Sequence, residues 1–212
     1  MKLRTAAIFA LILVSGCRHT GEIADEAAGV YAVRSSCPIL GVPTGTGDIT
    51  LFDPAGSTDS RAIDVTATIT DLRSTCQDAG NDVVSTATFT IVALRRDPGP
   101  ARQVYLPYFD VALQGGTKVV AKQVGQAAIN FAPGDVHGWA RVQATVRVNR
   151  GAATLPAEVR RAITRERKPG DPQAAIDPLA DPAIKAAVAN ATFEHLVGFQ
   201  LTQDQIKYNA TR

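Results

Sequence analysis

The sequence predicts a mainly β protein, an antiparallel immunoglobulin-like β-sandwich of about seven strands. Segments rich in Val, Ile, Thr and aromatic residues alternate apolar with polar side chains, and clusters of Gly, Pro and Asp separate them at intervals suited to a sandwich. The pattern changes after Arg150, which predicts a helical insertion at about 152–191, before the last strand. We expect residues 37–212 to form one domain with a single core.

Three segments show the clearest strand alternation. Their apolar residues are Ile63, Val65, Ala67 and Ile69, then Ala87, Phe89, Ile91 and Ala93, and then Val142, Ala144, Val146 and Val148. Polar residues fill the positions between, so one face of each strand is expected in the core and the other in water. Residues 105–113 and the segment from Val119 should form a hairpin, because two glycines at 115–116 are a turn signal. The last strand is expected at 193–201.

Three short helices are expected in the last third of the chain. Leu155, Val159, Ala162 and Ile163 line one side of the first helix, and the basic residues Arg160, Arg161, Arg165 and Lys168 cover much of the remainder. Asp181 followed by Pro182 predicts the cap and first residue of a second helix. Thr202 with Gln205 forms a capping-box pattern, which predicts a final helical turn or two.

The first sixteen residues have the three-part layout of a secretory signal peptide. Lys2 and Arg4 form a basic start, residues 6–14 are apolar, and the small residues Ser15 and Gly16 precede a cysteine. An apolar run of about ten residues is too short for a transmembrane helix, which needs about twenty. The sequence therefore predicts a signal peptide at 1–16.

The residues Leu13-Val14-Ser15-Gly16-Cys17 resemble the lipobox of bacterial lipoproteins. The resemblance implies that Cys17 is acylated after the signal peptide is removed. Each buried methylene contributes about 0.8 kcal/mol, so several acyl chains anchor a protein stably. Residues 17–36 are then a lipidated tether. The alternative is an ordinary secreted protein in which Cys17 is a free thiol.

Two further resemblances bear on location. In lipoproteins with this motif, aspartate after the acylated cysteine favours the inner membrane, so Arg18 implies the outer membrane. The segments 105–109 and 197–202 are similar to parts of uncharacterised envelope lipoproteins of alphaproteobacteria. That group implies the same location and offers no catalytic residues.

Export determines how the remaining cysteines are interpreted. With Cys17 acylated, Cys37 and Cys76 are the only two thiols left, and the periplasm is oxidising, so we expect one disulfide between them. A metal site is the weaker interpretation, because it needs more ligands than two thiols and no histidine lies near either cysteine in sequence.

Charge is balanced overall and uneven locally. Removing residues 1–16 takes away two of the 22 bases and none of the 20 acids, and a neutral chain gives no general attraction to nucleic acid. Residues 48–82 are rich in acids, and residues 141–168 carry eight bases against two acids. These segments are either two solvated faces or include a basic patch for anionic envelope polymers, with Arg160, Arg161, Arg165 and Lys168 as the candidate contacts.

The sequence has no recognisable catalytic or metal-binding motif. Gly-x-Ser-x-Gly and His-Glu-x-x-His do not occur. His19, His137 and His195 are far apart, and each is interpreted as a surface or packed histidine. The glycines at 41–47 precede a strand-like segment and therefore indicate a turn instead of a phosphate loop. No catalytic residue, metal or cofactor is expected.

The sequence favours a non-enzymatic, lipid-anchored envelope protein that binds a protein or an anionic polymer. The alternative is a structural role in an outer-membrane assembly, with residues 105–109, which contain Pro107, as an exposed sheet edge. A periplasmic enzyme is the third hypothesis. It would need a deep pocket that joins His137 or His195 to a carboxylate and a hydroxyl.

Overall fold

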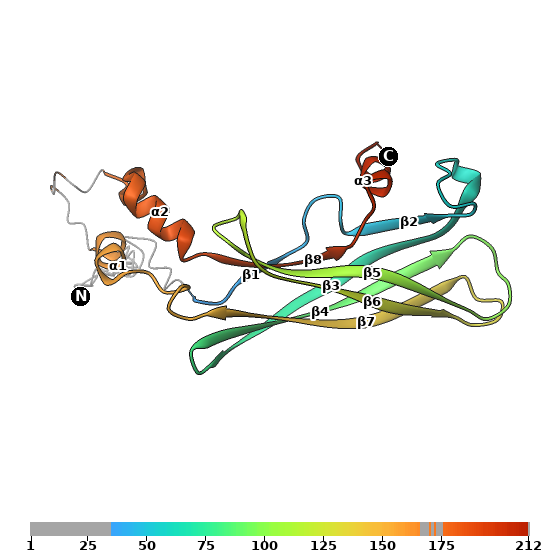
Figure 1. Cartoon of the computed structure of the whole chain (residues 1–212), viewed down its shortest axis with the longest axis horizontal. Helices are drawn as coiled ribbons and strands as arrows, with labels where there is room; N and C mark the ends of the chain where they lie inside the picture. The colour runs from blue at the N-terminus through green and yellow to red at the C-terminus, as the bar shows by residue number, and fades with distance from the viewer. Residues whose placement is uncertain (1–34, 166–169, 171, 173–175, 212) are drawn as a thin grey trace, which may run out of the picture.

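The computed structural model describes residues 35–165, 170, 172 and 176–211 (Figure 1). The expected signal peptide at 1–16, Cys17, Arg18, His19 and the tether up to residue 34 lie outside the described residues. Lys168, the last member of the expected basic patch, also lies outside them.

Two four-stranded sheets face each other along the molecule (Figure 1). Sheet A has the order β1 (Ile39–Gly41), β8 (Phe193–Phe199), β5 (Arg102–Gln114) and β6 (Lys118–Phe131). Sheet B has the order β2 (Asp48–Phe52), β3 (Ile63–Ala79), β4 (Asp82–Arg95) and β7 (His137–Asn149). Neighbouring strands are antiparallel, except that β1 runs parallel to β8. The predicted antiparallel sandwich, with helices before the last strand, is confirmed.

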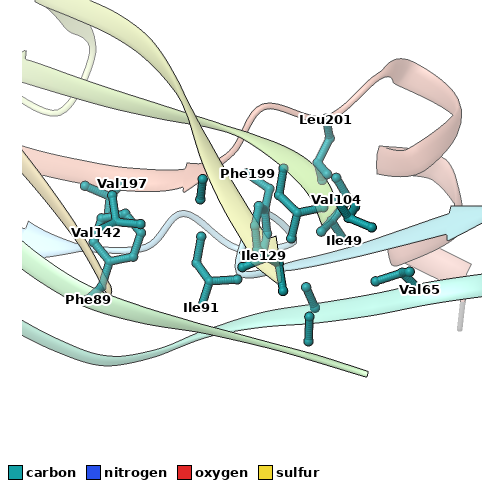
Figure 2. Close-up of a cluster of buried hydrophobic side chains, with 14 of the residues drawn as sticks. Ile49, Val65, Phe89, Ile91, Val104, Ile129, Val142, Val197, Phe199 and Leu201 are labelled. Atoms are coloured by element: carbon teal, nitrogen blue, oxygen red, sulfur yellow. The ribbon is translucent and has the colours of Figure 1, made fainter. Parts of the chain in front are cut away.

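The core lies between the sheets and follows the predicted alternation. Val65, Phe89 and Ile91 of sheet B are fully buried, and Val197 and Phe199 of sheet A face them (Figure 2). Alternate residues of a strand point to opposite faces, so the polar residues between them lie on the outside. Apolar burial of this kind stabilises the fold by about 25 cal/mol per Å².

The predicted β5–β6 hairpin is confirmed. Gly115 and Gly116 have φ angles of 63° and 76°, which glycine adopts readily. The core side of β5 carries Val104 and Leu106, whereas the ring of Tyr105 is 57% exposed. The aromatic group at 105–109 therefore divides between the two faces of sheet A.

The expectation that residues 105–109 form a sheet edge is correct only in part, because residues 105–107 lie beyond the end of the β5–β8 ladder whereas Tyr108 and Phe109 pair with β8. Residues 105–109 belong to β5, which lies between β8 and β6 in sheet A. Pro107 fits there because the β5–β8 ladder ends at the pair of Tyr108 and Phe199. The Pro107 carbonyl then accepts a hydrogen bond from the Gln200 amide at 2.9 Å, and no ladder donor is needed on that side.

The three predicted helices are present. They are α1 (Ala157–Thr164), α2 (Pro182–Asn190) and α3 (Gln203–Thr211), and short 3₁₀ turns lie at Ser60–Ala62 and Pro178–Ala180. Asp181 caps α2, because its carboxylate accepts a hydrogen bond from the Ala183 amide at 2.8 Å. Figure 1 places α1 and α2 together at one end of the sandwich. Among the described residues, no helix has the length and apolar character that crossing a bilayer requires.

The predicted disulfide between Cys37 and Cys76 is confirmed. Their Cα atoms are 6.0 Å apart, and 39 positions separate them in sequence. Cys37 precedes β1 of sheet A, and Cys76 lies in β3 of sheet B. The bond therefore joins the two sheets.

Candidate functional site

A chain of three hydrogen-bonded side chains crosses the space between the sheets. His195 Nε2 lies 2.8 Å from Asp110 Oδ1, and His195 Nδ1 lies 2.9 Å from Ser85 Oγ. The residues come from β4, β5 and β8, and their exposed fractions are 0% for Ser85 and His195 and 4% for Asp110. We call this set the polar junction.

Donor and acceptor chemistry fixes how the polar junction is bonded. A carboxylate only accepts hydrogen bonds, so His195 Nε2–H donates to Asp110. In the neutral tautomer, His195 Nδ1 then accepts from the Ser85 hydroxyl. Within the described residues, Asp110 Oδ2 has no hydrogen-bond partner. One carboxylate oxygen is therefore available to another donor.

The polar junction contains the three side-chain types of a serine hydrolase, but its serine is not accessible to a substrate. The hydroxyl, imidazole and carboxylate are linked in the order that activates a serine nucleophile. Ser85, however, is completely enclosed between the sheets. In this conformation no substrate carbonyl reaches Ser85 Oγ, and the group that borders open space is Asp110.

A cleft of about 440 Å³ opens on Asp110, between β5–β6 on one side and β7 on the other. The residues that line it are Tyr108, Asp110, Gln123, Val124, Gly125, Gln143, Ala144, Thr145 and Arg147. Gly125 lets the Tyr108 ring pack closely at this wall, because a Cβ atom at position 125 would lie 2.5 Å from that ring. Asp110 and Arg147 are the only charged residues among those that line the cleft.

The outer face of sheet B exposes an aromatic ring beside polar side chains. Trp139 is 69% exposed and pairs across the strands with Val92, which is 43% exposed. The outward positions that follow on β7 are Arg141 and Gln143, whose partners on β4 are threonines. We use the name "outer face of sheet B" for this surface, built from Val92, Leu94, Trp139, Arg141 and Gln143 with the threonines opposite.

The arginines of β7 differ from most other arginines in their partners. Arg61, Arg73, Arg102 and Arg150 form ion pairs with aspartates at 3.3 Å or less. Within the part of the chain that the structure describes, neither Arg141 nor Arg147 has an acidic partner. Their guanidinium groups are therefore free to bind an anion.

The structure places part of the sequence-predicted basic patch on α1. Arg160 and Arg161 are exposed on this helix, and Arg165 follows its last residue. Figure 1 shows α1 at the end of the sandwich where β7 finishes. His137 is exposed at the start of β7, so the structure does not bring it to the polar junction. In the described residues, no group of three or more His, Cys, Asp or Glu side chains is placed to hold a metal ion.

Sequence reasoning missed the partners of His195. It predicted a packed or surface histidine, and the structure shows a packed one. Its partners Ser85 and Asp110 are far from it in sequence. One signal was available, because Ser85 and Asp110 occupy inward positions in strands that otherwise bury apolar side chains. The periodicity of each strand does not show that Ser85 and Asp110 both bond His195.

No protein-family model and no curated protein sequence matches the chain. Among solved structures, the chain is similar to the crystal structure of a DUF1425 family member from Shewanella sp. pv-4, with 11% identity and a TM-score of 0.25. The match covers 51% of this chain and 81% of that one. A likeness at this TM-score carries no argument about fold or function.

Proposed function

We propose that the protein is a lipid-anchored, non-enzymatic binding module of the cell envelope, and that its ligand is an anionic polysaccharide. The observation that carries the proposal is the exposed Trp139 ring beside Arg141, a cation without an acidic partner among the described residues. Trp139 lies on the same face as the exposed Val92 and Leu94, and an exposed group of apolar side chains is typical of a contact surface.

The outer face of sheet B offers complementary chemistry to such a polymer. The Trp139 ring is a large, flat apolar surface that packs against the C–H face of a sugar ring. Arg141 donates paired hydrogen bonds to a carboxylate or phosphate. Gln143 and the neighbouring threonines supply donors and acceptors for hydroxyl groups. Arg160 and Arg161 on α1 extend the basic surface beyond the end of β7.

The membrane anchor of this proposal rests on the lipobox resemblance at Cys17. Arg18 supports the outer membrane, and the Cys37–Cys76 disulfide supports an oxidising compartment. Mass spectrometry of the mature chain tests the anchor. We expect acylated Cys17 at the new amino terminus, and an intact leader or a free Cys17 thiol would contradict it.

Co-sedimentation with purified peptidoglycan or lipopolysaccharide at rising salt tests the ligand. We expect binding that weakens as salt screens the charges. Trp139→Ala with Arg141→Ala should remove most of it, and changing Arg160, Arg161, Arg165 and Lys168 to Ala should weaken it further. Arg61→Ala is the control, because Arg61 is also exposed but is paired with Asp59. Full binding by both sets of variants would end the proposal.

The edge of sheet A favours a second candidate function, docking in an envelope assembly. β6 is the last strand of that sheet, and its Val119 and Val124 side chains are 57% and 58% exposed. An unpaired edge with apolar side chains accepts a strand from a partner protein. A photo-crosslinker placed at Val124 or at Trp139 distinguishes docking in an assembly from polymer binding in cells. Protein adducts at Val124 alone favour assembly, and polysaccharide adducts at Trp139 favour polymer binding.

A further inference from the structure

We infer that the cleft beside the polar junction binds a small zwitterion, an amino acid or a short peptide. Its ammonium group would bind Asp110 and its carboxylate would bind Arg147. This ligand differs from the polysaccharide proposed for Trp139 and Arg141, and the two sites are neighbours that share Gln143.

Asp110 supplies the acceptor for the ammonium group. Its side chain is 5% exposed, and its Oδ1 atom already accepts from His195 at 2.8 Å. Its Oδ2 atom has no hydrogen-bond partner within the described residues, although the residue lines the cleft. A buried carboxylate is costly unless donors or cations surround it, so a cationic donor in the cleft is strongly favoured.

Arg147 supplies the complementary cation. It lines the same cleft from β7, and no ion pair joins it to Asp110 or to another acid in the described part of the chain. The cleft thus presents one acid and one base that do not neutralise each other. A ligand that carries one ammonium and one carboxylate satisfies both, whereas a simple anion or cation satisfies only one.

The rest of the lining sets the size and polarity of the ligand. Tyr108, Gln123 and Thr145 contribute neutral polar side chains, and Val124 and Ala144 contribute apolar ones. About 440 Å³ is within the range of small-molecule sites and exceeds the volume of a single amino acid. Neutral donors and acceptors in the same cleft as two opposite charges match the peptide group of a dipeptide.

Isothermal titration calorimetry of the full chain with glycylglycine at neutral pH tests the inference. N-acetyl-glycylglycine lacks the ammonium group, and glycylglycine amide lacks the carboxylate. We expect both analogues to bind about 10- to 100-fold more weakly than glycylglycine, the range for losing one charge-assisted hydrogen-bonded contact. Equal binding of all three compounds, or no binding of glycylglycine at about 10 mM, would overturn the inference.

Two variants assign the contacts. Arg147→Gln changes an exposed side chain and should weaken glycylglycine about 10- to 100-fold while leaving glycylglycine amide unaffected. Asp110→Asn should remove the preference over the acetylated peptide. Arg73→Gln is the control, since Arg73 is an exposed arginine that lies outside the cleft, and should leave glycylglycine binding unchanged. Unchanged glycylglycine affinity in Arg147→Gln would refute the site even if Asp110→Asn fails to fold.

Discussion

Ser85, Asp110 and His195 occupy inward positions that strand alternation reserves for apolar side chains. They separate a large apolar cluster around Phe89 from a smaller one around Phe193. A polar group buried without partners costs roughly 1–3 kcal/mol, so the three residues are tolerated because they bond one another. A core position that carries such a network in place of Val or Leu indicates a role in addition to packing.

An ion pair between Arg102 and Asp64 joins the sheets at the opposite end from the disulfide. Arg102, at the start of β5, donates to Asp64 of β3 at 2.6 Å. This hydrogen bond lowers the pKa of Asp64 below its ordinary value. Because the pKa is lower in the folded state than in the unfolded chain, the pair contributes fully above the unfolded pKa of about 4. The contribution is lost as the pH falls through the pKa of the folded state.

We therefore expect Asp64→Asn to lower stability in a pH-dependent way. At pH 7 the free energy of unfolding should fall by roughly 1 kcal/mol, a modest figure because Arg102 is partly exposed and solvent screens the pair. At the acid limit Asp64 is protonated in both states, and the variant should match the native chain. Urea denaturation at several pH values measures this difference. A loss that is equally large at pH 7 and at low pH would contradict the prediction.

At the scale of elements, α3 shows how local and distant interactions combine. The predicted capping box forms, because the Thr202 amide donates to Gln205 Oε1 at 2.9 Å and the Gln205 amide donates to Thr202 Oγ1 at 3.3 Å. The helix then packs on β2, where Tyr208 meets Phe52 edge to face at 5.1 Å between ring centroids. Asn209 Nδ2 donates to the carbonyls of Gly45 and Asp48.

Thr202→Ala should loosen α3 without disturbing the sheets. The lost cap costs about 1 kcal/mol, and a helix of nine residues has little stability of its own. We expect faster hydrogen exchange of the α3 amides, with unchanged exchange in β4. Thr202→Ser keeps the hydroxyl and serves as the control. If α3 exchanges at the native rate in the alanine variant, its docking on β2 stabilises it without the cap.

The elements that sequence predicted well are those that local signals encode. Residues 63–69, 87–93 and 142–148 alternate with the period of a strand, and Asp181 with Pro182 marks the start of α2. The neighbours of each strand depend on contacts distant in sequence, which is why residues 105–109 were expected at an edge although β8 pairs with Tyr108 and Phe109. The candidate site was missed for the same reason, since its residues come from three strands.

At the scale of the whole molecule, polar and covalent links fasten the sandwich in addition to the apolar core. Arg95 is buried at one end, and its guanidinium donates to four backbone carbonyls at 2.6–3.1 Å. The carbonyls belong to Asp135, Pro100, Gly99 and Ala132. The disulfide joins the sheets elsewhere, beside the smaller apolar cluster. The polar junction lies beside the disulfide, because Ser85 pairs with Cys76 across β4 and β3, and the cleft opens between β6 and β7.

The disulfide should therefore contribute much of the stability of the end that holds the smaller cluster. Changing Cys37 and Cys76 to Ser opens a loop with a sequence separation of 39, which costs about 4 kcal/mol in the chain-entropy model. Urea denaturation with and without reductant measures the loss. The native chain should lose stability on reduction, and the double serine variant should be insensitive to reductant. The smaller cluster is adjacent to the disulfide. In the double serine variant, hydrogen exchange should therefore increase more for the amides of β1 and the last part of β3 than for the amides beside Arg95. Native stability that survives reduction would show that packing alone holds the sheets together.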